Sequence, residues 1–114
     1  MIKLKRIYES PKPSPGDGKR ILIDRLWPRG LRKDEVVVDE WLKDLAPSTS
    51  LRKWFGHDPA RWDDFRARHR RELMEKSDLL AKIRDDGRKG NVTILYAAKD
   101  TEHNNAIVVK EMVS

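Results

Sequence analysis

The stretch NVTILYAA at residues 91–98 is the clearest strand in the chain. Its apolar character is almost continuous, which is typical of a strand that is buried on both faces in a parallel sheet. Residues 1–8, MIKLKRIY, alternate between apolar and basic side chains, and residues 20–24, RILID, are mostly apolar, so both segments also predict strands. VVV at 36–38 indicates a short extended piece. We therefore expect a sheet with residues 91–98 at its centre.

Helix signals lie between these strands. Each expected helix begins at a residue whose side-chain oxygen can accept hydrogen bonds from the first backbone N–H groups. Apolar residues then recur three and four positions apart, as on the buried side of a helix. The expected caps are Asp39, Ser48, Asp58 followed by Pro59, Ser77, and Asp100 or Thr101. The expected inner stripe of the helix after Pro59 is Trp62, Phe65, His69 and Leu73.

Strands that alternate with helices in this order predict a single small α/β domain over residues 1–114, with a short, largely parallel sheet flanked by helices. A chain of 114 residues is large enough to bury one core. Residues 10–19, SPKPSPGDGK, contain three prolines and two glycines, which suit neither a helix nor a sheet ladder. We expect this segment to be a mobile surface loop.

The composition excludes several classes of protein. There is no cysteine, so disulfides, thiolate nucleophiles and cysteine-ligated zinc are excluded, and we expect a cytoplasmic protein. No run approaches the roughly 20 apolar residues of a membrane-spanning helix, so we expect no membrane partner. The net charge of +6 permits attraction to polyanions. Residues 61–76, however, mix acids with bases, which is typical of a solvated helix face.

Two charged motifs come directly after predicted strands, and they should lie close together if those strands are neighbours and parallel. DRLWPRG at 24–30 ends the strand at 20–24, and AAKDTEHN at 97–104 ends the strand at 91–98. In open α/β sheets, ligands bind beyond the carboxyl ends of the strands. Because arginine binds phosphate or carboxylate in a planar, bidentate manner, we expect a pocket for a small anionic ligand, phosphorylated or carboxylated. The expected ligand-binding residues are Asp24, Arg25, Trp27, Arg29, His57, Lys99 and Asn104.

Two other functions fit the same chain. Asp100 and His103 have the groups of an acid–base pair, and the nearby cations stabilise negative charge, so a small enzyme is one alternative. A nucleic-acid-binding module that uses lysines and arginines of the first strand and of the helix after Pro59 is the other. All four tryptophans occupy positions that suit a core, which leaves no evident platform for stacking bases.

The candidate site residues also have structural interpretations. Asp24 and Arg25 can form an ion pair that fixes the turn, and Trp27 can close the end of the core. Asp100 can cap a helix, and His103 can take part in that cap. These alternatives stay open from the sequence.

Motifs for metals, cofactors and nucleophiles are not found. His57, His69 and His103 lack the spacing that places two metal ligands on one face of a helix or strand. There is no GxSxG, GxGxxG or GxxxxGK[ST] sequence, which argues against a serine nucleophile elbow, a dinucleotide site and a P-loop. We expect no metal and no cofactor, and the oligomeric state stays open.

Several longer motifs resemble a known family. They are DRLWPRG at 24–30, Trp41, Lys43 and LAPS within 41–48, LRKWFGHDP at 51–59, Phe65 through Leu73, and LYAAKD with HN at 95–104. In this order they resemble the YeaO-like branch of the bacterial family called domain of unknown function 488, over nearly the whole chain. The resemblance implies a small cytosolic bacterial α/β protein and defines the fold class better than the function. Relatives often carry tyrosine where this chain has His69, which favours a core role for His69.

Overall fold

β4 (Val92–Tyr96) lies at the centre of a four-stranded sheet in the computed structural model, which describes residues 1–114. β1 (Ile2–Arg6) and β2 (Lys19–Leu22) flank β4, and β3 (Glu40–Trp41) pairs with the far side of β2. All three pairings are parallel. The prediction of a small α/β fold with a largely parallel sheet and a buried central strand is therefore confirmed.

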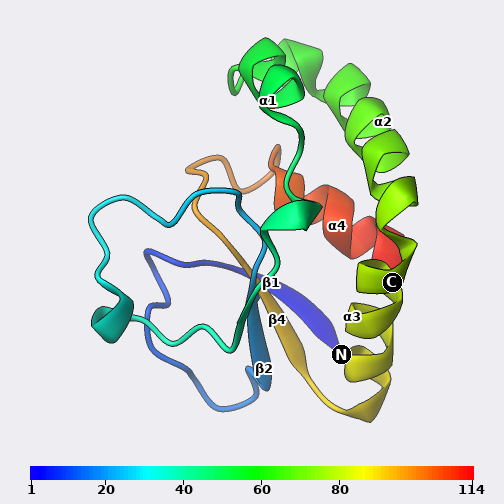
Figure 1. Cartoon of the computed structure of the whole chain (residues 1–114). Helices are drawn as coiled ribbons and strands as arrows, with labels where there is room; N and C mark the ends of the chain where they lie inside the picture. Colours follow the sequence, from blue (N-terminus) through cyan, green and yellow to red (C-terminus); the bar gives the residue numbers. More distant parts are fainter.

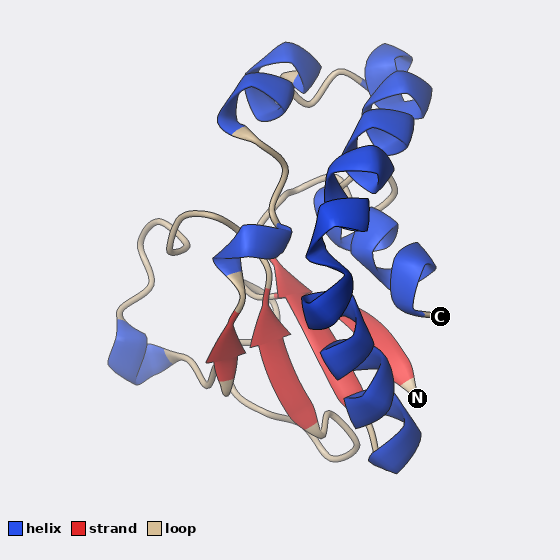
Figure 2. Cartoon of the chain, turned by 45° about the vertical axis from the view of Figure 1, so that its right-hand side comes forward, coloured by secondary structure: helices blue, strands red, loops and turns tan.

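Four α-helices follow or connect these strands (Figures 1 and 2). They are α1 (Thr49–Phe55), α2 (Trp62–Leu73), α3 (Ser77–Lys89) and α4 (Asn105–Val113). A single 3-10 turn joins α2 to α3, so the two form one long helical column, which crosses in front of the sheet in Figure 2. α3 and α4 pack against the sheet, α2 packs on α4, and α1 packs on α2. As a result α1 and α2 project beyond the carboxyl ends of the strands, at the top of Figure 1.

Two of the expected helix caps are confirmed. Ser48 caps α1, because its hydroxyl oxygen accepts a hydrogen bond from the backbone N–H of Leu51. Asp58 accepts one from the N–H of Ala60 at 3.0 Å, with Pro59 at the first helical position, and this 3-10 turn leads into α2. In both places a short polar side chain satisfies a backbone donor that the first turn leaves free.

The expected helix after Asp39 is wrong. The chain instead forms β3 and then a short 3-10 helix at Lys43–Leu45, and the VVV segment before it is not a strand. The Asp39 carboxylate accepts the backbone N–H of Arg20 at 2.8 Å, and the N–H of Leu42 donates to the carbonyl of Leu22. Contacts with β2 therefore determine the conformation here and outweigh the local capping signal.

The last two expected caps are also wrong. Ser77 is the first residue of α3 but caps nothing, because the helical column enters α3 without a break. Neither Asp100 nor Thr101 caps α4. Asn104 does so, since its side-chain oxygen accepts the N–H of Ile107 at 3.1 Å. The turn from 99 to 104 thus places several polar groups between β4 and the helix.

Side chains of the sheet point alternately to two faces that are covered in different ways. One face, which carries Ile21 and Ile94, meets the helices and forms the larger buried cluster. No helix packs on the other face, which lies under the long loops before β2 and before β3, on the left of Figure 1. The apolar part of that second face is small and consists of Ile7, Leu22, Val36 and Leu95. Hydrogen bonds and ion pairs hold the loops against the rest of this face.

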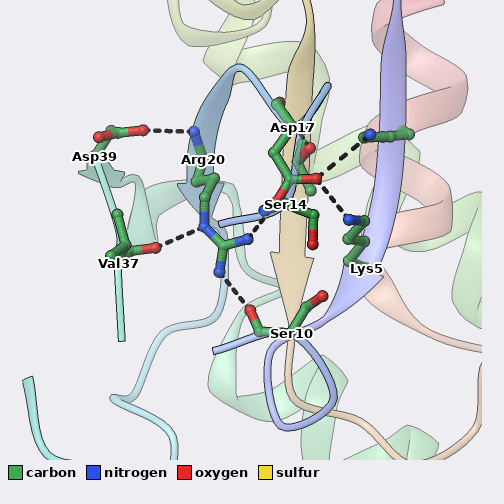
Figure 3. A network of polar contacts seen from close by, with 9 residues as sticks. Lys5, Ser10, Ser14, Asp17, Arg20, Val37 and Asp39 are labelled. Atoms are coloured by element: carbon green, nitrogen blue, oxygen red, sulfur yellow. Dashed lines mark hydrogen bonds and ion pairs between the residues drawn. The ribbon is translucent and has the colours of Figure 1, made fainter. Parts of the chain in front are cut away.

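Arg20 is a fully buried arginine on the loop-covered face (Figure 3). Its guanidinium donates to the carboxylate of Asp17 at 2.7 Å, to the carbonyl of Val37 at 2.8 Å, and to the carbonyl of Ser10. Ser10 and Asp17 belong to the loop before β2, and Val37 belongs to the loop before β3. One side chain therefore fastens both long loops to β2.

Asp17 is buried beside Arg20 in the middle of the Pro- and Gly-rich loop. Its carboxylate also binds Lys5 at 2.5 Å and Lys3 at 3.4 Å, and its carbonyl accepts the hydroxyl of Thr93 at 2.8 Å. Burial alone would raise the pKa of Asp17, but hydrogen bonds from Lys5, the Ser14 backbone and Arg20 outweigh burial and hold that pKa well below its usual range. The loop is thereby tied to β1, β2 and β4, a contact that its composition does not reveal.

We expect Asp17→Asn to lower the free energy of unfolding by about 3–5 kcal/mol, the usual cost of removing one partner from a buried ion pair. The substitution removes the carboxylate that partners the buried Arg20. Lys3 and Lys5 lose the same partner, so three cations then lie close together without it. Urea unfolding at pH 7 measures the change. Asp34→Asn is the control, because Asp34 pairs with Arg32 on the exposed surface and its loss should leave stability nearly unchanged. Equal, small effects of the two substitutions would show that the buried pair is dispensable.

Candidate functional site

A cleft of about 800 Å³ opens at the carboxyl ends of β2 and β4. The motifs at 24–30 and 97–104 both line it, because their strands are adjacent and parallel. The third wall comes from the segment 46–57, together with Phe65 of α2. All nine residues expected from the sequence to form the site line this cleft: Asp24, Arg25, Trp27, Arg29, His57, Lys99, Asp100, His103 and Asn104.

Asp24 joins the elements that form the cleft. Its carboxylate accepts the backbone N–H of Ala97 at 2.9 Å and the side-chain amide of Asn105 at 3.0 Å, so it connects the end of β2 to the end of β4 and to α4. Its carbonyl accepts the indole N–H of Trp41 at 2.6 Å. Burial raises the pKa of Asp24, and the two hydrogen bonds to its carboxylate only partly oppose this effect. A carboxyl group with a raised pKa and no cation beside it therefore lies in the cleft.

Arg25 does not pair with Asp24, so the structural alternative of an ion pair within this turn is wrong. No carboxylate lies within 4 Å of its guanidinium. Its Nη2 donates a long hydrogen bond of 3.4 Å to the carbonyl of Pro47, and its Nε is buried without any acceptor. A buried donor without a partner is rare and costs free energy. The guanidinium of Arg25 is thus held by one long hydrogen bond and by no carboxylate.

The other cations of the cleft also lack a carboxylate partner. Arg29, Arg52 and Lys99 are exposed and, like Arg25, form no ion pair. Elsewhere in the chain some cations, such as Lys19, are held by carboxylates at close range, and others, such as Lys89, are not. Four unpaired positive charges around one cleft create a positive potential there.

Asp100 and His103 are the acid and the imidazole of the cleft. His103 Nδ1 lies 2.9 Å from Asp100 Oδ2. The N–H of Glu102 and the His103 ring both bind this carboxylate and hold the pKa of Asp100 below its usual value. The ring of His103 packs edge-on against Trp62, with centroids 5.4 Å apart. The imidazole is therefore oriented from both sides, as a group that transfers a proton requires.

The remaining expected residues have clear positions. Asn104 is buried, and besides capping α4 it donates to the carbonyl of Asp100 at 2.9 Å, which fixes the turn. His57 is exposed on the α1 side of the cleft, with a positive φ of 58°. Trp27 is half-buried, donates to the carbonyl of Leu31, and meets Trp41 edge to face.

Four residues that line or shape the cleft were not among those expected from the sequence. Arg52 comes from α1, which the sequence does not place beside the strand ends, and Tyr8 comes from the turn after β1. Asn105 contacts Asp24 across 81 positions of sequence. Phe55 lines the cleft although its spacing marks it as core. Only the basic character of Arg52, within LRKWF, was a usable signal.

The prediction that all four tryptophans suit the core is confirmed only in part. Each is only partly buried and packs at the edge of an apolar cluster: Trp27, Trp41, Trp54 and Trp62. Their ring faces are not free, however. The guanidinium of Arg68 lies 4.4 Å from the Trp54 ring, and the ammonium of Lys43 lies 4.5 Å from the Trp41 ring. These cation–π contacts use the surfaces on which bases would stack.

These features define an open-sheet α/β protein with an unpaired cationic cleft at the carboxyl ends of adjacent parallel strands, the edge at which such sheets bind ligands. None of its helices has both the length and the apolar character needed to cross a bilayer. The chain belongs to the DUF488 family: the profile described as the inactive DUF488-N3 subclade matches residues 1–114.

Relatives in two bacterial groups are similar along almost their whole length. The chain is 40% identical over 110 residues to Uncharacterized protein YeaO of Escherichia coli K12, a match that covers 96% of this chain and 94% of YeaO. It is 38% identical over 113 residues to Uncharacterized protein Rv3073c of Mycobacterium tuberculosis H37Rv, covering 99% and 93%. No solved structure matches the chain significantly. The resemblance to the YeaO-like family is thus confirmed.

The wall of the cleft at 45–48 is attached to α2 by two contacts. The buried ring of His69 bonds through Nε2 to the carbonyl of Leu45, 3.0 Å away. The carboxylate of Glu72 accepts the backbone N–H of Ser48 at 2.8 Å and its hydroxyl at 2.6 Å. His69 is fully buried, as the sequence favoured, and its Nδ1 has no partner. Burial lowers the pKa of His69.

We expect His69 to make the fold sensitive to mild acid. Because the unfolded chain binds a proton at His69 more tightly than the folded chain does, the free energy of unfolding falls as the pH drops below about 6.5. The loss from this group reaches at most about 2 kcal/mol at pH 5. Urea unfolding of the wild type and of His69→Phe at pH 7.5 and pH 5 measures it. The variant should be less stable at pH 7.5, where it loses a hydrogen bond, yet lose less stability on acidification. An equal acid response in both proteins would contradict this expectation.

Proposed function

We propose that this protein binds a small anionic ligand, phosphorylated or carboxylated, in the cleft at the ends of β2 and β4. The observation that carries the proposal is the set of four cations without carboxylate partners around that cleft. Arg25 contributes most, because it lines the cleft, pairs with no carboxylate and is held only by a weak hydrogen bond from Nη2. A guanidinium can bind a carboxylate or a phosphate through two parallel hydrogen bonds.

The family description argues against turnover. The matching profile is that of an inactive subclade, and the cleft is nevertheless lined by charged side chains. A packed turn does not require unpaired cations, since ion pairs or apolar residues would stabilise it better. A retained binding site explains both features.

Thermal unfolding with a panel of ligands tests the proposal. The panel contains inorganic phosphate, sugar phosphates, nucleotides, dicarboxylates and a short oligonucleotide, all at one ionic strength. A ligand at a hundred times its Kd adds about 2.7 kcal/mol to the free energy of unfolding, which is a readable rise in Tm for a domain of this size. We expect a small anion to produce such a rise. Arg25→Ala should weaken its binding about 10- to 100-fold, because a hydrogen bond to a charged group contributes about 1.5–3 kcal/mol.

The matched control is Lys89→Ala. Lys89 is also an exposed cation without an ion pair, but it ends α3 at the amino edge of the sheet, opposite the cleft. This variant should respond to the anion as the wild type does. If Arg25→Ala responds equally, the anion binds elsewhere, and if only the oligonucleotide raises Tm, the ligand is a nucleic acid and the proposal is wrong.

The contact between Asp100 and His103 favours a second candidate function, acid–base catalysis in the same cleft. With Nδ1 bonded to the carboxylate, Nε2 of His103 is left to exchange a proton with a ligand. The cations would stabilise negative charge that develops during the reaction. The description of the subclade as inactive weighs against this candidate.

Turnover measurements separate the two functions. We expect the wild type to release no product from phosphate esters or carboxylic esters beyond the rate in buffer, because binding alone is the leading proposal. His103→Ala, Asp100→Asn and Lys89→Ala are assayed in parallel. Turnover that is present in the wild type and in Lys89→Ala, but lost in the two site variants, would establish the catalytic alternative instead.

A further inference from the structure

We propose that the anion is a nucleoside monophosphate, whose phosphate meets the cations and whose base lies on the apolar lining of the cleft. The inference rests on the proposed function and narrows its ligand class. It depends on three properties of the cleft, namely the number of its unpaired charges, the character of its lining, and the free acceptor sites of Asp24.

The number of cations favours phosphate over carboxylate. The four unpaired cations come from three segments, with Arg25 and Arg29 after β2, Arg52 on α1 and Lys99 after β4. A single carboxylate carries one negative charge and two oxygens. A phosphate monoester carries about −1.5 to −2 charges at neutral pH and presents three acceptor oxygens, so several donors from different directions can bind it.

The lining favours a flat organic body on that phosphate. A cleft of about 800 Å³ is far larger than a phosphate ion needs and lies in the range typical of sites for small organic molecules. Leu26, on its rim beside Arg25, is 63% exposed, one of three large apolar side chains that solvent reaches freely. Covering such a side chain with a planar ring removes apolar surface from water. The aromatic rings of the lining are Tyr8, Trp27, Phe55, His57, Phe65 and His103.

Asp24 adds acceptors that match the edge of a base. Each oxygen of its carboxylate accepts one hydrogen bond from the protein, from Ala97 or from Asn105. A carboxylate oxygen has a second lone pair, so both can accept a further N–H from a ligand. Amino and imino groups of nucleobases are such donors. The cleft therefore combines sites for the phosphate, the ring and the polar edge of one nucleotide.

Isothermal titration calorimetry with four probes tests the inference: inorganic phosphate, ribose 5-phosphate, AMP and UMP, each at the same ionic strength. We expect at least one nucleotide to bind the wild type about fivefold or more tightly than ribose 5-phosphate, which corresponds to the low end of one base–aromatic contact. Leu26→Ser should weaken the nucleotide several-fold and leave inorganic phosphate unchanged. Because Leu26 is exposed, this variant does not disturb the core.

The outcomes distinguish this inference from the function on which it rests. Arg25→Ala should weaken all four probes, and Lys89→Ala none. Ribose 5-phosphate that binds as tightly as both nucleotides overturns the nucleotide inference and leaves the anion site intact. Nucleotide binding that neither Leu26→Ser nor Arg25→Ala weakens also overturns it. A folded wild type that binds none of the phosphates overturns the inference and, when the dicarboxylates also produce no rise in Tm, the proposed function with it.

Discussion

The buried ion pair of Arg20 with Asp17 provides on one face of the sheet the support that helices provide on the other. α3 and α4 cover the first face through apolar packing, but only loops cross the second. Loops have no regular apolar stripe to pack on a sheet. The backbone carbonyls that they bury also need hydrogen-bond donors. The guanidinium supplies several N–H groups in a fixed fork, and here they bind Asp17, Ser10 and Val37 at once. This one side chain thus joins both long loops to β2, together with direct bonds between the loops such as that from the N–H of Val37 to the carbonyl of Pro11.

This distribution of charge also explains why the cleft remains positive. The acids that pair with cations mostly lie outside the cleft. Asp17 pairs with Arg20 under the loops, Glu40 pairs with Lys19 and Lys82, and Glu111 pairs with Arg66. The cleft retains only two carboxylates. Asp24 is held by a backbone N–H and an amide, and Asp100 by His103 and the N–H groups of its own turn. Neither neutralises an arginine or lysine, so the positive charges of the cleft face solvent without a partner.

The sequence predicted those parts of the molecule that depend on local pattern. The continuous apolar run at 91–98 identifies β4, and the charged motifs after β2 and β4 fall at one edge because both strands are parallel. Contacts between residues far apart in the sequence could not be predicted from it. β3 has two residues and exists because Asp39 and Leu42 bond to β2, against the helical signal of their own segment. Arg20 is the basic residue of the predicted strand at 20–24, and nothing local indicates that its guanidinium is buried.

The same limit applies to the candidate site. The residues that follow β2 and β4 were found from spacing, whereas Arg52 and Asn105 reach the cleft only through the packing of α1 and α4. The N-cap of α4 is a second case in which contacts, and not the local sequence pattern, decide the role of a residue. Both residues suit a cap, but the carboxylate of Asp100 is engaged by its own turn and by His103, which leaves Asn104 to begin α4.

The position of Arg25 connects the helical layer to the chemistry of the cleft. His69 and Glu72 lie three positions apart on α2, so they share one side of the helix and grip the segment at 45–48 through Leu45 and Ser48. Pro47 lies between these two contacts, and its carbonyl is the acceptor toward which Arg25 points. At 3.4 Å that bond is weak, and Nε beside it has no acceptor. The guanidinium therefore has no carboxylate partner and only one weak hydrogen bond, so an anion that binds to it displaces no strong partner, as the proposed function requires.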